Sequence, residues 1–399
     1  MLLSFVCVLG YDALNGRGCG IPLATLRARA QSKRDDLMTL TEATVREALK
    51  GVNDPEIGKD LVALNMVGEI SVDGSAVQVR IDLTTPACPL KGKIQGDIEE
   101  ALSAVGAQSV SIDWGVQMAA QAHSQQSLVP GVRYVIAVGA GKGGVGKSTI
   151  AVNLAAGLSR SGARVGLLDA DIYGPSIPTM MGLNEKPQAG ADKKILPMQA
   201  HGMKVISMGS FVDDEAALVW RGPMLNKALR QFFADVRWGD LDYLVVDLPP
   251  GTGDVPLSIA QLVTVGAAVI VTTPQDVAVA DVLRAKTMFD TLKIPVAGLI
   301  ENMAGFTPPG GGEPIPVFGQ GGGEKAAKRL NVPLIGALPI DQRMSNQGDE
   351  GTPMVLADPQ SDIALKLLEL AQNVAGRLSV LAVQRSAQDG GGSIQVDRT

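Results

Sequence analysis

One glycine-rich loop has the residue types and the spacing that hold a triphosphate. Residues 141–148 read GKGGVGKS and match the pattern G-x-x-x-x-G-K-[ST]. An apolar stretch, YVIAVGA, precedes the loop and a helical stretch, TIAVNLAAGLSR, follows it, so backbone N–H groups can face phosphates at a helix N-terminus. We therefore predict an ATP site in which Lys147 neutralises the β and γ phosphates and Ser148 ligates Mg²⁺. The predicted nucleotide contacts are Gly141, Lys142, Gly143, Gly144, Val145, Gly146, Lys147, Ser148 and Thr149.

Carboxylates follow two of the apolar stretches further along the chain. Asp169 and Asp171 end RVGLLDAD, and Asp247 lies in DYLVVDL. At the carboxyl ends of parallel strands such groups face the crevice in which ligands bind. We predict that Asp247 holds Mg²⁺ through water, and that the glycine-bearing segment 248–254 moves when the γ-phosphate leaves. An aspartate that only caps the next helix is the alternative for Asp247.

Cysteine and histidine supply few candidates for metal chemistry. The cysteines are Cys7, Cys19 and Cys88. Cys88 lies between two prolines just before a helical stretch, a placement that would lower the pKa of its thiol and favour thiolate chemistry. A buried structural cysteine is an equal alternative. Neither His123 nor His201 has a partner at metal-ligand spacing, so we interpret both as ordinary polar residues.

The phosphate loop and the aspartates require a parallel sheet with helices on both faces. Short apolar stretches alternate with helical stretches over residues 132–385, which is typical of a doubly wound α/β domain. The stretches are YVIAVGA, RVGLLDA, KVISMG, DYLVVDL, AAVIVTT, PVAGLIE and PLIGALP. We therefore predict an α/β fold with a doubly wound, mostly parallel P-loop sheet. The stretch DIALKLLELAQNVAGRLSVLAV is predicted to be a final helix that packs on the core rather than an interfacial helix.

A smaller α+β domain is predicted over residues 39–114. Thr39 and Glu42 have capping-box spacing ahead of a short helix. Alternating stretches on either side of residues 73–74 predict a hairpin. Apolar residues recur every four positions over residues 90–102, as on one face of a helix, and SVSID predicts a last strand.

The segments outside these domains have no sustained apolar period. Residues 115–131 are rich in Gln, Ala and Ser, which predicts a linker. Residues 386–399 are predicted to be a disordered tail. Residues 1–37 are predicted either to be disordered or to precede the true start at Met38.

The composition of the chain indicates in which compartment it works and which kinds of partner are disfavoured. Apolar residues make up 46% of the chain and charged residues 19%, which is enough to bury a core. No apolar run approaches the roughly 18 residues of a membrane span, so we predict no membrane partner. The net charge of −6 disfavours nucleic acid. The odd and sparse set of cysteines fits the reducing cytoplasm.

The motifs together resemble a known family. Lys142 is a second lysine within the loop, as in the deviant-Walker ATPases, which include the MinD and ParA proteins. GKGGVGKST, LLDADIYGPSIP, WRGPM, DLPPGTGD, IENM and VFGQGGG occur in that order and resemble the Mrp/ApbC-type iron–sulfur cluster carrier ATPases. LTTPACPL resembles the signature of the iron–sulfur assembly domain that many of these carriers have at the N-terminus.

The resemblance implies a function and several residue roles. It implies an ATPase that binds iron–sulfur clusters, of the 4Fe-4S type, and transfers them to apoproteins with the help of assembly factors. It also implies a homodimer in which Lys142 reaches the partner's nucleotide. Asp171 would orient the attacking water, and Asn302 of IENM would read the adenine edge beneath the loop around Pro339.

One departure from the family pattern concerns the cluster. These carriers usually place C-x-x-C shortly after the ENM motif, but residues 301–309 here read ENMAGFTPP and no cysteine follows Cys88. Thiolate ligation of a shared cluster at that place is therefore impossible. Two copies of Cys88 in a dimer would be the remaining thiol ligands. A MinD- or ParA-like spatial organiser, and a metal-free nucleotide-dependent scaffold for iron–sulfur assembly, are the alternative functions.

Overall fold

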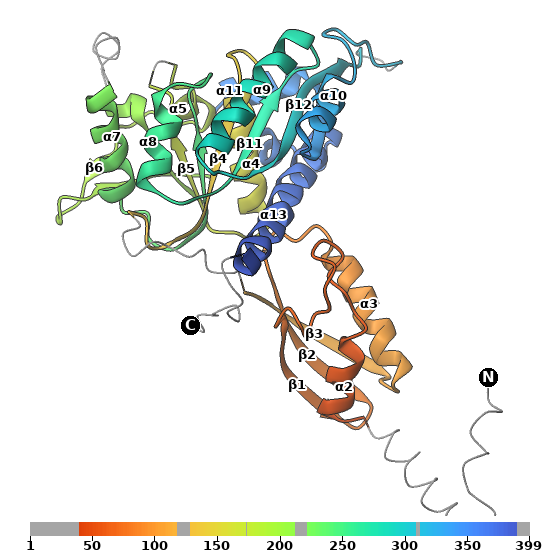
Figure 1. Ribbon diagram of the computed structural model, residues 1–399. Helices are drawn as coiled ribbons and strands as arrows, with labels where there is room; N and C mark the ends of the chain where they lie inside the picture. Colours follow the sequence, from red (N-terminus) through yellow and green to blue (C-terminus); the bar gives the residue numbers. More distant parts are fainter. Residues whose placement is uncertain (1–39, 118–127, 173, 212–221, 309–311, 389–399) are drawn as a thin grey trace, which may run out of the picture.

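The computed structural model describes residues 40–117, 128–172, 174–211, 222–308 and 312–388 (Figure 1). Residues 1–37, most of the predicted linker and tail, and the residues Cys7, Cys19, Thr39 and His123 lie outside these ranges. Among the described residues, no helix combines the length and the apolar character that crossing a membrane would require.

An eight-stranded sheet forms the centre of the larger domain, in the order β13-β12-β11-β4-β10-β5-β9-β8. All neighbouring strands are parallel except β8, which pairs antiparallel with β9 at one edge. The predicted doubly wound, mostly parallel sheet is confirmed, and the edge strand β8 was not predicted. The strands are β4 (Val132–Ala140), β5 (Val165–Asp169), β8 (Met198–Ala200), β9 (Met203–Ser207), β10 (Leu241–Asp247), β11 (Val265–Thr272), β12 (Val296–Phe306) and β13 (Leu334–Ile340). A separate two-stranded ribbon joins β6 (Gln188–Ala189) to β7 (Ile195–Leu196).

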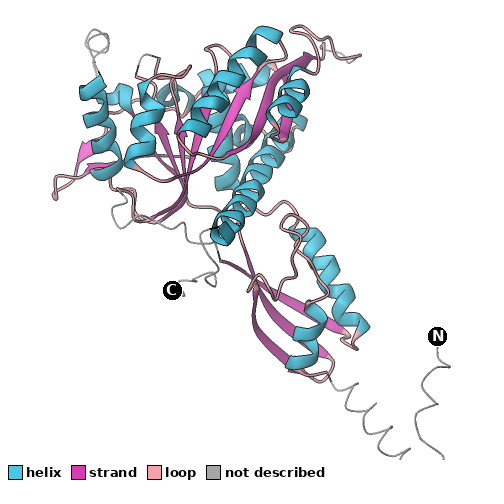
Figure 2. Cartoon of the chain, viewed as in Figure 1, coloured by secondary structure: helices cyan, strands magenta, loops and turns pink. Residues whose placement is uncertain are grey.

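Helices cover both faces of this sheet, so its strands are buried on both sides (Figure 2). One face carries α4, α12 and α13, with α5 and α11 at its rim, and the other carries α7, α8, α9 and α10. Because both faces are covered, the central strands consist almost entirely of apolar residues. The helices are α4 (Lys147–Arg160), α5 (Ile177–Met180), α7 (Gly222–Ala234), α8 (Asp254–Leu262), α9 (Asp276–Thr291), α10 (Gly322–Leu330), α11 (Gln342–Asp349), α12 (Met354–Ala357) and α13 (Asp362–Gln388), with a 3₁₀ turn η1 (Met208–Phe211).

The last helix, α13, packs on the core as predicted. Its buried residues include Ile363, Leu367, Leu370 and Val374, which join the apolar cluster on the α4 face of the sheet. α13 lies along α4, the helix that begins at the phosphate loop.

Within residues 40–117 the smaller domain has three strands and two helices. β1 (Val67–Asp73) pairs antiparallel with β2 (Ala76–Leu83), and β2 pairs parallel with β3 (Ser109–Val116). The helices are α2 (Glu42–Leu49) and α3 (Lys91–Ala104). The hairpin and both helices are confirmed, and β3 continues for two residues into the predicted linker. The capping residue was predicted wrongly, because Thr41 caps α2 and exchanges hydrogen bonds with Thr44.

The two domains meet where the segment after β2 touches β10 and α13. Thr85 Oγ1 and Tyr243 Oη lie 2.7 Å apart in a buried hydrogen bond. Ala87 joins the apolar core of the larger domain, and Ser379 Oγ donates to the carbonyl oxygen of Thr84 at 3.5 Å. Figure 1 shows the end of α13 beside this segment of the small domain.

Candidate active site

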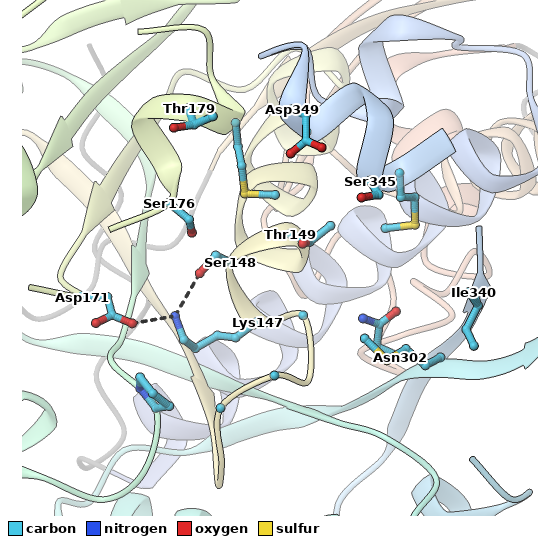
Figure 3. A pocket seen from close by; sticks show the side chains of 18 of the residues that line it. Lys147, Ser148, Thr149, Asp171, Ser176, Thr179, Asn302, Ile340, Ser345 and Asp349 are labelled. Atoms are coloured by element: carbon cyan, nitrogen blue, oxygen red, sulfur yellow. Dashed lines mark hydrogen bonds and ion pairs between the residues drawn. The ribbon is translucent and has the colours of Figure 1, made fainter. Parts of the chain in front are cut away.

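A cavity of ≈ 730 Å³ lies at the carboxyl ends of the sheet strands, beside the phosphate loop. Figure 3 shows Lys147 and Asp171 at one end of it and Asn302 with Ile340 at the other. β4, which leads into the loop, lies between β10 and β11 in the sheet. In open α/β sheets, ligands bind in the crevice at the carboxyl ends of the strands, which is where this cavity lies. The lining residues are Lys142, Gly143, Gly144, Gly146, Lys147, Ser148, Thr149, Asp171, Pro175, Ser176, Thr179, Met180, Pro250, Asn302, Met303, Pro339, Ile340, Asp341, Met344, Ser345, Gly348 and Asp349.

Glycines in the loop are needed for its backbone shape. Gly144 has φ +79° and Gly146, the N-cap of α4, has φ +81°, a region in which side chains other than hydrogen are strained. A Cβ on Gly146 would also overlap the amide of Asn302. A Cβ on Gly141 would overlap the backbone of Asp281 in α9. The loop therefore has a backbone shape that residues with a Cβ could not adopt at Gly141 and Gly146 without strain or overlap.

A lysine, a hydroxyl and a carboxylate converge behind the loop. Lys147 Nζ donates to Asp247 Oδ1 at 2.7 Å, and Ser148 Oγ donates to Asp247 Oδ2 at 2.6 Å. Both members of the ion pair are buried, with 7% of the Lys147 side chain and 0% of the Asp247 side chain exposed. Burial raises the pKa of Asp247 against the opposing effect of Lys147. These groups fit a magnesium–triphosphate, because the amine suits phosphate oxygens and the two oxygen ligands suit Mg²⁺.

The two aspartates at the end of β5 and just beyond it lie beside this group. Asp171 Oδ2 lies 3.9 Å from Lys147 Nζ, and Asp171 lines the cavity. Asp169 does not line it and is fully buried. Burial, and next the charge of Asp247, raise the pKa of Asp169 to about 7. The positions of Asp171 and Asp247 agree with the predicted roles, and the roles themselves stay predictions.

The second lysine of the loop contacts its own chain. Lys142 Nζ donates to Gln275 Oε1 at 3.2 Å, and Gln275 is the N-cap of α9. Thr273 Oγ1 donates to the same oxygen at 3.0 Å. Lys142 thus lines the cavity from the side of α9, and its reach toward a partner subunit stays a prediction.

Asn302 closes the other end of the cavity. Its Nδ2 donates to the carbonyl oxygen of Val145 at 2.9 Å, and only 5% of the residue is exposed. Met303, next to it, has φ +60°, which is uncommon for a residue with a side chain. Pro339 lines the cavity as expected. The reading of adenine by Asn302 stays a prediction.

Sequence reasoning did not identify the wall opposite the loop. This wall consists of α5 and α11, and Figure 3 shows Ser176, Thr179, Ser345 and Asp349 from these elements around the cavity. The start of α5 lies within LLDADIYGPSIP, which supports the family resemblance but was not interpreted as part of a cavity wall. For α11 the available signal was the polar pattern of SNQGDE, next to the predicted loop around Pro339.

The expected lowering of the Cys88 pKa is wrong. Cys88 is half-buried at the domain junction, where burial and the carboxylates of Glu56 and Asp54 raise its pKa to about 11. Among the described residues, no group of three or more His, Cys, Asp and Glu side chains is arranged to hold a metal ion. His201 has a hydrogen bond with the carbonyl oxygen of Gly351 at 2.9 Å, as an ordinary polar residue would.

Comparisons with known proteins cover both domains. The family model described as "NUBPL iron-transfer P-loop NTPase" matches residues 131–375, and the model described as "Iron-sulfur cluster assembly protein" matches residues 42–114. The iron-sulfur cluster carrier protein of Deinococcus radiodurans is 49% identical over 86% of this chain and 96% of its own length. That of Synechocystis is 45% identical over 86% and 99%. A solved nucleotide-binding protein from Archaeoglobus fulgidus in complex with ADP is 39% identical, with a TM-score of 0.50, over 55% of this chain and 87% of its own.

Proposed function

Because the chain belongs to the NUBPL iron-transfer P-loop NTPase family, we propose that it hydrolyses ATP to transfer an iron–sulfur cluster to apoproteins. The resemblance inferred from the motifs is thereby confirmed. The observation that carries the proposal is the convergence of Lys147, Ser148 and Asp247 behind a glycine loop that opens into the cavity. The relative from Archaeoglobus fulgidus, which holds ADP, supports a nucleotide in that cavity.

Each residue of the site has its own role in phosphoryl transfer. The loop's backbone N–H groups and Lys147 would hold the phosphates. Ser148 and Asp247 would hold Mg²⁺, whose positive charge would stabilise the negative charge of the phosphates. Since Lys147 and Ser148 both contact Asp247, binding requires them to exchange part of this contact for phosphate and metal. Asp171, beside Lys147, orients the attacking water. Segment 248–254 follows Asp247 directly and would respond to the loss of the γ-phosphate.

The cluster is the cargo, and this chain offers few ligands for it. No cysteine follows Asn302, and Cys88 is the only cysteine within the described residues. We propose a homodimer in the cytoplasm that holds a 4Fe-4S cluster with two Cys88 residues and with thiols from the assembly factor or client. Because burial raises the pKa of the Cys88 thiol to about 11, iron must displace the thiol proton when it binds. Neither nucleic acid nor membrane takes part.

Lysine substitution tests the proposal. Lys147→Ala should abolish both ATP hydrolysis and ATP-dependent transfer of cluster to an apo-ferredoxin, because it removes the phosphate-binding amine. Lys366→Ala removes an exposed lysine on α13 and is the matched control, with wild-type values expected for both. Phosphate release is measured beside the gain of ferredoxin absorbance. Wild-type hydrolysis by Lys147→Ala would refute the site.

A metal-free scaffold for iron–sulfur assembly is the second candidate, and the missing cysteine pair favours it. The two functions differ in iron content after anaerobic reconstitution. A carrier binds iron and sulfide, loses them in Cys88→Ser, and shows the visible absorbance of a cluster. A scaffold hydrolyses ATP but binds neither element.

A further inference from the structure

Three adjacent strands end in polar residues behind the cavity. Asp247 on β10, Asp169 on β5 and Ser207 on β9 are direct neighbours in the register of the sheet. Asp169 and Ser207 are both fully buried, and neither lines the cavity. They cannot touch a nucleotide directly, so their polarity needs another explanation.

Both carboxylate oxygens of Asp169 accept hydrogen bonds. The backbone N–H of Asp171 donates to Oδ1 at 3.1 Å, and Ser207 Oγ donates to Oδ2 at 3.0 Å. Ser207 Oγ accepts in turn from the backbone N–H of Gly209 at 3.2 Å. The carboxylate therefore connects the end of β9 to the peptide of Asp171.

Asp171 is the residue that this connection holds in place. Its Oδ2 lies 3.9 Å from Lys147 Nζ, and its Oδ1 accepts from the backbone N–H of Gly174 at 3.3 Å. A shift of the Asp171 peptide would move its carboxylate relative to the phosphate end of the cavity. Misplacement by about 1 Å can reduce a rate roughly 100-fold.

We propose that Asp169 and Ser207 are positioning residues, which hold the Asp171 carboxylate where it orients the attacking water. This inference rests on the proposed ATPase function. Under this proposal, Asp169 acts through Oδ1, the oxygen that accepts the hydrogen bond from the Asp171 N–H. Its negative charge is not needed.

Substitutions at Asp169 distinguish a role of its acceptor oxygen from a role of its charge. Asp169→Asn keeps an oxygen that can accept from Asp171, whereas Asp169→Ala removes it. We expect Asp169→Ala to lower kcat for ATP about 10- to 100-fold with KM for ATP little changed, and Asp169→Asn to restore most of kcat. Ser207→Ala removes one of the two hydrogen bonds to the Asp169 side chain and should lower kcat by up to about fivefold. It remains informative if Asp169→Ala does not fold.

Amide hydrogen exchange supplies a readout that needs no hydrolysis. In the protein without nucleotide, a peptide containing Asp171 should exchange slowly in the wild type and Asp169→Asn, and faster in Asp169→Ala. If Asp169→Asn is as impaired as Asp169→Ala, or if Asp169→Ala keeps both wild-type kcat and slow exchange, the positioning role is refuted. If the exchange differs as expected but the wild type does not hydrolyse ATP, the positioning contact stands and the proposed function fails.

Discussion

Glu56 makes the stability of the domain junction dependent on pH. This half-buried residue follows α2 in the small domain, and its carboxylate lies against Gly376 of α13, where a Cβ would overlap it. Burial, and next the charge of Asp54, raise its pKa from 4.5 to about 7, against the opposing charge of Arg377. The folded protein therefore holds this proton more tightly than the unfolded chain does.

The sign and the size of the effect follow from linkage. Between pH 4.5 and 7 the unfolded chain loses the proton first, so the free energy of unfolding falls as pH rises through this window. The full shift corresponds to about 3.4 kcal/mol above pH 8. Water still reaches part of the carboxylate and screens it, so the expected destabilisation is about half of this value. It is about 1.7 kcal/mol at pH 8.5 and about 0.4 kcal/mol at pH 5.

The substitution Glu56→Gln should remove this penalty. We expect it to raise the free energy of unfolding by about 1.7 kcal/mol at pH 8.5 and by less than about 0.5 kcal/mol at pH 5, as measured by urea unfolding followed with tryptophan fluorescence. Glu69→Gln, on the exposed face of β1, is the matched control and should change neither value. A destabilised Glu56→Gln at pH 8.5, or an equal gain at both pH values, would refute the reasoning.

Two further predictions concern the loop and the thiol. Gly146→Ala should weaken ATP binding at least about tenfold in calorimetry, because the left-handed backbone costs about 1–2 kcal/mol and the new Cβ displaces Asn302 from the Val145 carbonyl oxygen. Gly74→Ala is the control, because Gly74 also has a positive φ of +59° but has open space around it; this variant should keep wild-type affinity for ATP. An equal loss of ATP affinity in both variants would show that crowding at Asn302 is irrelevant. For Cys88, the alkylation rate with iodoacetamide, in a variant whose other two cysteines are serine, should stay low at pH 7.5 and rise toward pH 11. A half-maximal rate below pH 8 would contradict the buried environment.

Local signals were enough to predict where the glycine loop lies, because its residues are adjacent in the sequence. The loop from Gly141 to Ser148 is one continuous motif between a strand and a helix, and Asp247 ends an apolar strand. Their meeting at one edge follows from parallel pairing alone. The hairpin at residues 73–74 was predictable for the same reason, since a turn and two alternating stretches are local features.

The features that sequence reasoning missed depend on register and on contact between domains. The hydrogen bond from Ser207 to Asp169 requires β9 to pair with β5 in one particular alignment, which no local pattern indicates. The pKa of Cys88 depends on Glu56, which comes near it only in the folded domain. The cap of α2 was misplaced because Thr39 and Thr41 both precede plausible first turns, and only backbone geometry distinguishes them.

The hydrogen bond between Thr85 and Tyr243 has a consequence for related chains of different length. Tyr243 is on β10, the strand that ends in Asp247, and it stacks against Tyr134 at a ring-centroid distance of 6.1 Å. The small domain covers its hydroxyl and adds Ala87 to the same core. A natural relative that has the sheet without the small domain would leave a phenol and an apolar patch facing water. Such relatives should therefore carry either a different side chain at this strand position or another segment that shields it, and reading their sequences would reveal which.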